Sequence, residues 1–351
     1  MNLICPSDWP ETRPPTSVPR PKRHNCDAKV AEQATGILPN PVLGDMLSEI
    51  RYTNYKDFAG VKFPTNFHGH TGAVGYDYAR GFWTLDPNSL QLNVKAVQPN
   101  PSIATVAVPD AVRQATIPPV RVETQKLAEG IWLMAGGTHN SVLVEFRDYL
   151  AVVEAPLNEA RSLAVIAEAK RLVPNKPIEY VVVTHHHFDH IGGLRTYYAE
   201  GAKIIVQLPN REFIEHYVLS PAQRTLDPDE LSLHPEPSTH TPMDRFETVT
   251  KKFVLSDGTR TMEIHAMLEE SLNHALNMLF VYFPTEKILI NADMYTPPNA
   301  GAPLPAPNAA MTSLYQNIQR LKLGVVQHVP IHGRVGTNEE FLKIVARPVQ
   351  R

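Results

Sequence analysis

Residues Val181 to Gly193 read VVVTHHHFDHIGG, in which four histidines and one aspartate follow a run of apolar β-branched residues. Such a run predicts a buried strand, and the glycine pair after the histidines predicts a turn into a helix. A buried imidazole needs partners for both ring nitrogens. Adjacent histidines are therefore poorly suited to a core, and the stretch predicts a functional site at the end of a strand.

The spacing within this stretch predicts two neighbouring metal ions. His185 and His187 are two residues apart at the end of an extended segment, so we expect them to point to the same side and share one metal. Asp189 and His190 follow where the chain turns, which places them to bind a second metal. His186 has the opposite parity and is expected to pack elsewhere. Imidazole and carboxylate ligands suit Zn²⁺, with Fe and Mn as competitors.

The composition is that of a globular protein with more than one domain. Of the 351 residues, 43% are apolar and 20% are charged, which is an ordinary globular balance. The net charge of −3 and the lack of a basic block argue against nucleic acid as a partner. No apolar run reaches the roughly 18 residues of a transmembrane helix, and the first residues do not resemble a signal peptide. The two cysteines, Cys5 and Cys26, lie far from the histidine motif, so histidine and carboxylate must hold any metal there.

Proline content and residue patterning divide the chain into three regions. Residues 1–40 are rich in proline and predict a disordered or loosely docked arm. Residues 41–110 contain short alternating segments that predict a small antiparallel β module, and the sequence PDAVRQATIPP after it indicates a linker. In residues 120–346, strands dominate both ends and helices punctuate the middle, with one strand expected at TVTKKFVL, residues 248–255. This order predicts an α+β domain with two sheets between helices.

The motif resembles the THxHxDHxGG signature of metallo-β-lactamase-fold hydrolases. The matching residues are Thr184, His185, His187, Asp189, His190, Gly192 and Gly193. The resemblance implies a four-layer αββα sandwich over residues 120–346, preceded here by the β module. Three later residues match, in order, those that complete the family's site: His274 in SLNHALNMLFVYFP, Asp293 in KILINADMY and His332 in VVQHVPIHGR.

By this resemblance two Zn²⁺ ions are expected per chain, with Fe or Mn as alternatives. One ion is implied on His185, His187 and His274, another on Asp189, His190 and His332, and Asp293 is implied between them.

The chain departs from the family pattern in two places. Glu154 stands where the family has a supporting aspartate, and His274 lacks the usual flanking glycines. His265 competes with His274 as a ligand, but it lies within a strand pattern and is expected to pack.

Three further histidine-containing segments leave alternatives open. His328 also lies within a strand pattern and is expected to be structural. His139 in GGTHN either touches substrate or is an exposed loop residue, and exposure is the favoured interpretation. The HxH pair His68 and His70 in FHGHTG has no third ligand nearby and predicts a solvated loop.

The resemblance and the residues together predict a hydrolase. A hydroxide held by two zinc ions would open a carboxylic ester, lactone or β-lactam. Asp189 is a candidate catalytic residue as well as a ligand, and Tyr295 either donates a hydrogen bond to a developing oxyanion or packs in a wall. Trp132, Met134 and the loop of residues 297–307 are expected to form apolar walls, which favour an uncharged or amphiphilic substrate over a polyanion.

Two other functions stay open at this point. Relatives with the same fold suggest a mononuclear iron persulfide dioxygenase or a thioesterase, and a catalytically degenerate scaffold is the third hypothesis. The expected partner is a small-molecule substrate, with a homodimer as an open alternative. Residues 46–108 weakly resemble the β-sheet of outer-membrane lipoprotein carriers, which suggests a periplasmic or secreted origin although the chain's own start shows no export signal.

Overall fold

The computed structural model describes residues 33–71, 75–77, 82–84, 88–98, 108–116, 119–219, 224–234, 245–268, 274–299 and 301–346. The chain divides into two compact units. The smaller comprises residues 1–37, 47–74 and 85–107, and the larger comprises residues 38–46, 75–84 and 108–351. Most of the predicted N-terminal arm lies outside the described residues. Residues 33–40, however, form a strand rather than part of an arm.

In the four-stranded sheet near the N-terminus, the last three strands of the order pair antiparallel, as the alternating pattern predicts. Its order is β1-β2-β3-β6, formed by β1 (Gln33–Asn40), β2 (Gly44–Phe58), β3 (Val61–Thr71) and β6 (Asn88–Asn93). Ala59 and Gly60 join β2 to β3 and both have positive φ, 54° and 84°. Two residues in this conformation make the tight turn whose twist matches that of a hairpin. The short strands β4 (Gly75–Asp77) and β5 (Phe82–Thr84) pair with each other.

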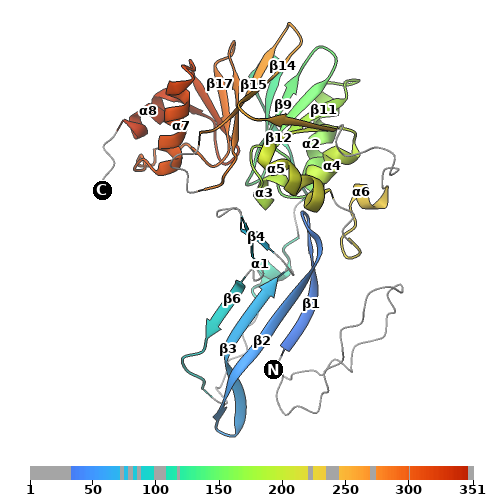
Figure 1. Cartoon of the computed structure of the whole chain (residues 1–351), viewed down its shortest axis with the longest axis vertical. Helices are drawn as coiled ribbons and strands as arrows, with labels where there is room; N and C mark the ends of the chain where they lie inside the picture. Colours follow the sequence, from blue (N-terminus) through green and yellow to red (C-terminus); the bar gives the residue numbers. More distant parts are fainter. Residues whose placement is uncertain are drawn as a thin grey trace. The chain divides into compact units, whose positions relative to one another are not determined.

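The larger unit contains two main sheets, which are seen in Figure 1. The first has the order β13 (Phe246–Val249), β12 (Lys203–Gln207), β11 (Ile178–Val182), β10 (Leu150–Val153), β9 (Ser141–Glu145), β8 (Ile131–Ala135) and β7 (Glu123–Ala128). The second has the order β14 (Lys252–Ser256), β15 (Thr261–Ala266), β16 (Leu279–Phe283), β17 (Ile288–Asn291), β18 (Gln327–Pro330) and β19 (Gly336–Thr337). Strands β10 to β13 are parallel neighbours, and the rest of the first sheet is antiparallel.

Three apolar cores separate four layers. The central core lies between the sheets and holds Val153 and Val182 of the first sheet with Val281 of the second. A second core packs the other face of the first sheet against α2 (Glu159–Leu172) and α4 (Leu194–Ala199). A third packs the second sheet against α7 (Ala309–Arg320) and α8 (Asn338–Val345). The order helix, sheet, sheet, helix confirms the predicted αββα sandwich.

The remaining helices are short. They are α1 (Asp110–Arg113) within the predicted linker, α3 (Phe188–Ile191) in the histidine motif, α5 (Leu208–Phe213) continued by the π-helical turn η2 (Ile214–Val218), and α6 (Glu230–Leu233). No helix in the described part of the chain is long and apolar enough to cross a membrane.

The segment TVTKKFVL forms two strands, where the sequence predicted one. Its first part belongs to β13, which pairs parallel with β12 in the first sheet. Its second part is β14, which pairs antiparallel with β15 in the second sheet. The chain changes sheets at the exposed residues Thr250 and Lys251. The prediction was wrong because residues on both sides keep a strand-like pattern, and alternation alone does not reveal a change of sheet.

The turn between β1 and β2 is part of the larger unit and packs into its core. Val42 is fully buried in the core around α2 and α4. The Arg224 guanidinium donates hydrogen bonds to the carbonyl oxygens of Asn40, Pro41 and Val42 at 3.1, 3.1 and 2.8 Å. The domain of residues 120–346 expected from the sequence is therefore supplemented by residues 38–46 and 75–84.

Candidate metal centre

The histidine motif lies at the carboxyl end of the parallel strands β10, β11 and β12. β11 ends at Val182, and the chain runs through a short loop into α3, which carries Asp189 and His190. β10 ends one residue before Glu154, whose backbone is left-handed with a φ of 75°. Loops leaving this edge of a parallel sheet converge and form sites. The fold thus brings the motif and Glu154 to one edge.

The two glycines that close the motif are required by close packing. A Cβ on Gly192 would overlap the carbonyl oxygen of Leu157, and a Cβ on Gly193 would overlap Ser162 Oγ. Neither glycine has a positive φ, so lack of space rather than backbone freedom explains them. Their approach fixes α3 against the loop that precedes α2.

The first cluster of candidate ligands joins the motif to two later loops. His185, His187, His274 and Asp293 place one ligand atom each within 4.8 Å of one another. The Asp293 Oδ2 atom lies 3.2 Å from His185 Nε2 and 2.9 Å from His274 Nε2. The ring of His187 lies 4.6 Å, centroid to centroid, from the rings of both His185 and His274. The structure thus brings together the residues that the resemblance implied for one metal.

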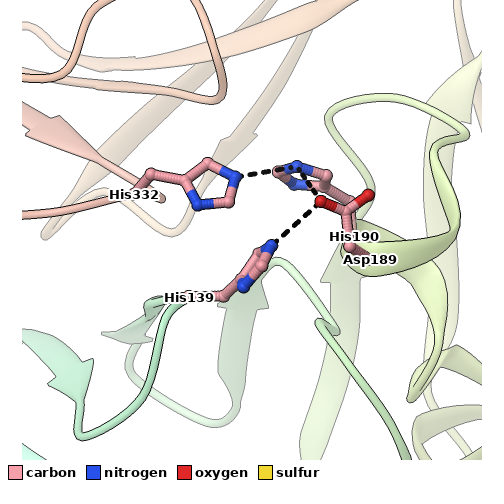
Figure 2. Close-up of side chains that lie close together, drawn as sticks. All are labelled: His139, Asp189, His190 and His332. Carbon is pink, nitrogen blue, oxygen red and sulfur yellow. Dashed lines mark hydrogen bonds and ion pairs between the residues drawn. The ribbon is translucent and has the colours of Figure 1, made fainter. Parts of the chain in front are cut away.

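The second cluster contains Asp189, His190 and His332, and also His139 (Figure 2). One ligand atom from each of these four residues lies within 4.8 Å of the others. His190 Nε2 and His332 Nε2 are 3.2 Å apart. Each is also 2.9 Å from an oxygen of Asp293, Oδ2 for His190 and Oδ1 for His332. Asp293 therefore contacts both clusters, in the position that the resemblance implied.

The directions of the hydrogen bonds indicate that the centre is suited to a cation. His190 Nδ1 lies 2.5 Å from Glu154 Oε2, and His332 Nδ1 lies 3.2 Å from the Thr138 carbonyl oxygen. Carboxylate and carbonyl oxygens only accept, so both Nδ1 atoms must donate. A neutral ring then presents a lone pair at Nε2. Two such lone pairs face each other and a carboxylate, which is repulsive unless a proton or a metal ion lies between them.

Burial and neighbouring carboxylates have opposite effects on the histidine pKa values. Burial lowers the pKa of His185 well below its ordinary value and also lowers the pKa of His187. At His190 the effect of burial is outweighed by the carboxylates of Glu154 and Asp293, which raise the pKa to about 10. A metal ion binding at Nε2 would displace the proton that His190 retains.

Asp293 is strongly biased toward its ionised form. Burial opposes this, but hydrogen bonds from four surrounding histidines hold its pKa far below the usual range; these are His185, His190, His274 and His332. Its backbone is left-handed, with a φ of 59°, a conformation that is uncommon for residues other than glycine and recurs at functional sites. An ionised carboxylate among imidazoles is a suitable ligand for a divalent cation.

Glu154 connects the motif to the preceding strand. Its side chain is fully buried and accepts hydrogen bonds from the Thr184 backbone N–H at 2.8 Å and from the Thr184 hydroxyl at 3.0 Å. The same carboxylate accepts from His190 Nδ1. These contacts fix the His190 ring with Nε2 directed at Asp293, which is the usual support for a ligating histidine. The glutamate thus makes the supporting contact expected of an aspartate.

His139 is buried, whereas the sequence favoured an exposed loop residue. It is 6% exposed, and its Nε2 lies 3.1 Å from Asp189 Oδ2. Its ring centroid lies 4.0 Å from that of His332. The burial comes from long-range packing of the loop between β8 and β9, which the local pattern GGTHN does not show.

Tyr295 does not join either cluster. Its side chain is 1% exposed and packs in the core under α7 and α8, with its ring 4.7 Å from Phe341 and 5.3 Å from His328 between centroids. This position favours the packing role over the role of oxyanion donor. Met134 is also fully buried in a core, and Trp132 packs against that core, so neither occupies the predicted position in a substrate wall.

Three further buried histidines belong to neither cluster. His265 lies 2.9 Å from Glu263 and stacks on Phe280, and His328 lies 3.0 Å from Asn338. Both therefore have the packing environment expected from their strand patterns. His186 is 2% exposed, and burial lowers its pKa to about 4. Among the described side chains, the candidate metal clusters include none of these three, nor His68.

The region around the histidine motif matches a known protein family. A family model described as the metallo-beta-lactamase superfamily matches residues 134–294. Among curated proteins, none matches this chain.

Similar solved structures include a metallo-beta-lactamase from Hirschia baltica, with 19% identity and a TM-score of 0.45 over 64% of this chain and 97% of that one. The mono-zinc form of the metallo-beta-lactamase FIM-1 from Pseudomonas aeruginosa has 18% identity and a TM-score of 0.43. The match covers 63% of this chain and 92% of that one. A metallo-beta-lactamase from Pontibacter korlensis has 17% identity and a TM-score of 0.45. The match covers 65% of this chain and 100% of that one.

Proposed function

We propose that this chain, whose residues 134–294 match the family model of the metallo-beta-lactamase superfamily, is a dinuclear zinc hydrolase that opens carboxylic esters, lactones or β-lactams. Members of this superfamily are mostly metal-dependent hydrolases, which supports the general class. The observation that carries the proposal of two ions is the position of Asp293. Its Oδ2 atom faces His185 and His274 of one ligand set and His190 of the other, and its Oδ1 atom faces His332. A carboxylate in this position is suited to bridging two ions.

The proposed ligands divide between two sites. His185, His187 and His274 would hold the first ion, and Asp189, His190 and His332 would hold the second, with Asp293 shared. All are nitrogen or carboxylate oxygen donors, which suit Zn²⁺. When bound, two such ions supply a water nucleophile near neutral pH and polarise the carbonyl oxygen of the substrate.

The carboxylates at the centre differ in their access to solvent. The Asp189 side chain is 51% exposed, the Asp293 side chain 13% exposed, and Glu154 is fully buried. Asp189 is therefore the carboxylate best placed to meet water and substrate, and we assign to it the role of accepting a proton from the attacking water. Glu154 instead holds His190 in position.

The surroundings of the motif favour a substrate with an apolar part. Phe188, which directly follows His187, stacks with Phe213, and Phe213 stacks with Tyr217, at centroid distances of 6.4 and 5.7 Å. Tyr217 is 37% exposed. An aromatic row of this kind fits an acyl or ring substituent better than a polyanion, which would need arginine and lysine side chains.

The test begins with metal content. The protein is loaded with Zn²⁺, freed of excess metal and analysed by elemental mass spectrometry, and hydrolysis is then measured on a lactone, a chromogenic β-lactam, a thioester and a phosphodiester. We expect two Zn²⁺ per chain and turnover of the lactone or the β-lactam, lost on chelation and restored by zinc.

Matched variants make the test specific. His187→Ala should lose metal and activity, whereas His216→Ala, at an exposed position outside both clusters, should lose neither. One iron per chain with oxygen consumption on a persulfide would instead support the oxygenase hypothesis. A folded wild-type chain that takes up no metal would support the degenerate scaffold and exclude the proposed function.

A further inference from the structure

Three of the predicted histidine ligands, His185, His190 and His332, share an arrangement in which the protein contacts Nδ1 and Nε2 faces a carboxylate. His190 and His332 are held at Nδ1 by Glu154 and by the Thr138 carbonyl, as described above. His185 follows the same rule, because its Nδ1 lies 3.1 Å from Thr184 Oγ1 and its Nε2 faces Asp293. Ligating histidines in metalloproteins typically have the second ring nitrogen hydrogen-bonded in this way.

His139 has the same arrangement, although the resemblance gives it no role. Its Nδ1 lies 2.8 Å from Thr138 Oγ1, and its Nε2 lies 3.1 Å from Asp189 Oδ2. Figure 2 shows the ring beside His332, with one nitrogen directed at the Asp189 carboxylate. Thr138 thus contacts two rings of this cluster, His332 through its carbonyl oxygen and His139 through its hydroxyl.

The loop that carries His139 is held at both ends, so the ring is positioned in advance. After His139, the Asn140 backbone N–H donates to the Ile331 carbonyl at 2.7 Å. The Asn140 side-chain amide donates to the carbonyl oxygens of Pro330 and Gly333 at 3.0 and 2.9 Å. These bonds join the loop to the segment that contains His332. Preorganisation of this kind is what a metal site requires of its ligands.

Before His139, the buried Arg161 guanidinium donates to the carbonyl oxygens of Met134 and Ala135 at 2.7 and 2.9 Å. Gly136 has a φ of 105°, and a Cβ there would overlap the Arg121 carbonyl oxygen. The loop therefore has little freedom to withdraw His139 from the cluster.

We propose that His139 is a direct ligand of the second metal, through Nε2. This inference rests on the proposed function, since it adds a residue to one of its two metal sites. The second site would then have three imidazoles and Asp189 of its own, whereas the first has three imidazoles, and the two share Asp293. The alternative is that His139 Nε2–H donates to Asp189 and only positions that carboxylate.

The two roles differ in the atom that carries the ring proton, so Co²⁺ substitution distinguishes them. A histidine that binds Co²⁺ through Nε2 keeps an N–H at Nδ1, and the paramagnetic ion shifts that proton far outside the normal NMR range. In the Co²⁺-loaded wild-type protein, we expect one shifted, exchangeable signal to show a nuclear Overhauser effect to the Thr138 methyl group. His139→Gln should lose this signal and weaken Co²⁺ binding at one site by about tenfold or more.

The control is His265→Gln, which removes a histidine of similar burial, 3% exposed, that lies outside the clusters. It should keep every shifted signal and both dissociation constants. The inference is overturned if no shifted signal in the wild type connects to Thr138, a result that does not depend on how well a variant folds. It is also overturned if folded His139→Gln binds two Co²⁺ with unchanged affinity. Wild-type protein that binds no Co²⁺ or Zn²⁺ would instead remove the proposed function itself.

Discussion

The larger unit contains two buried polar clusters, each built around a carboxylate. They differ in the side chains that surround it, which are arginines in one cluster and histidines in the other. In one, Arg195 donates to both carboxylate oxygens of Asp229, through Nη2 at 3.0 Å and through Nε. Arg224 lies beside the same carboxylate, with Nε 3.4 Å from Asp229 Oδ2. Its other nitrogens bind the carbonyl oxygens of the turn between β1 and β2. In the other cluster, the Nε2 atoms of four histidines converge on the single carboxylate of Asp293; these are His185, His190, His274 and His332.

The difference shows that burial of polar groups does not by itself indicate a ligand site. The arginine cluster contains its own cations, and their N–H groups donate to carboxylate and carbonyl oxygens. The charge of Asp229 is therefore balanced within the chain. The histidine cluster has Nδ1 atoms committed to acceptors and Nε2 atoms converging on one another and on Asp293. It needs a cation from outside. The first cluster should therefore act on stability and the second on metal binding.

The largest expected effect is at Asp293. Asp293→Asn preserves shape but removes the charge shared by the two clusters, so we expect loss of at least one metal per chain and a fall in kcat/KM of more than about 100-fold, since a ligand matters more than its supporting contacts. Elemental analysis and the hydrolysis assay measure both. Asp229→Asn is the matched control, with the same chemical change in the arginine cluster. Equal metal loss in both variants would contradict the division between the clusters.

The reverse experiment is Arg195→Met. Arg195 is 4% exposed, and its removal leaves Asp229 buried without its bidentate partner. Removing one member of a buried ion pair costs about 3–5 kcal/mol in the free energy of unfolding, which urea denaturation followed by circular dichroism measures. Metal content per folded chain should stay at the wild-type value. Loss of metal at unchanged stability would show that the two clusters are coupled.

The sequence predicted the part of the centre that depends on local spacing. His185, His187, Asp189 and His190 lie within six residues, between the end of β11 at Val182 and the end of α3, so their closeness in sequence already places them close together in space. His274, Asp293 and His332 were found through the resemblance, and the structure places all three beside the motif. The αββα layers were also predicted, from the order of strands and helices in residues 120–346 and from the resemblance.

Features that depend on long-range packing were not predictable. His139 is buried because Asn140 binds a segment almost 200 residues away, and no local pattern encodes that contact. Tyr295 was expected near the metals because it follows Asp293 by two residues. The chain turns there, however: Asp293 has a positive φ, and the Tyr295 N–H binds Asn291 Oδ1 at 2.9 Å. Parity holds only along regular strands.

A pH titration distinguishes the two clusters, because the stabilisation by Asp229 and the metal binding by the histidines should be lost in different pH ranges. Burial opposes the ionised form of Asp229, but hydrogen bonds from Arg195 and Ser232 outweigh it and lower the pKa to about 2. Because the folded pKa lies below the unfolded value of 3.8, the contribution to stability is complete above pH 3.8 and is lost as the pH falls toward 2. By linkage it amounts to about 2 kcal/mol.

The measurement is the difference in unfolding free energy between wild type and Asp229→Asn, in urea with a fixed concentration of stabilising sulfate. This difference in unfolding free energy should be constant from pH 7 to pH 5 and should decrease below pH 4. Metal loss should come earlier, near pH 6, where protons compete for the ligating histidines. A difference that already narrows between pH 7 and pH 5 would show that another group, not Asp229, sets the acid sensitivity.

The smallest expected effect concerns the apolar side chain that accompanies the arginine cluster. Val42 is fully buried, in the turn whose carbonyl oxygens bind Arg224. Val42→Ala removes the equivalent of two methylene groups, which corresponds to a loss of about 1.6 kcal/mol in the unfolding free energy. Ile37→Ala is the control, since Ile37 is 55% exposed and should change stability little. If both variants unfold like the wild type, the turn does not pack into the larger unit in solution. The contacts of Arg224 with the turn would then contribute little to the free energy of unfolding. If only Val42→Ala is destabilised and its metal content is unchanged, residues 38–46 belong to the stability of the domain and not to its metal centre.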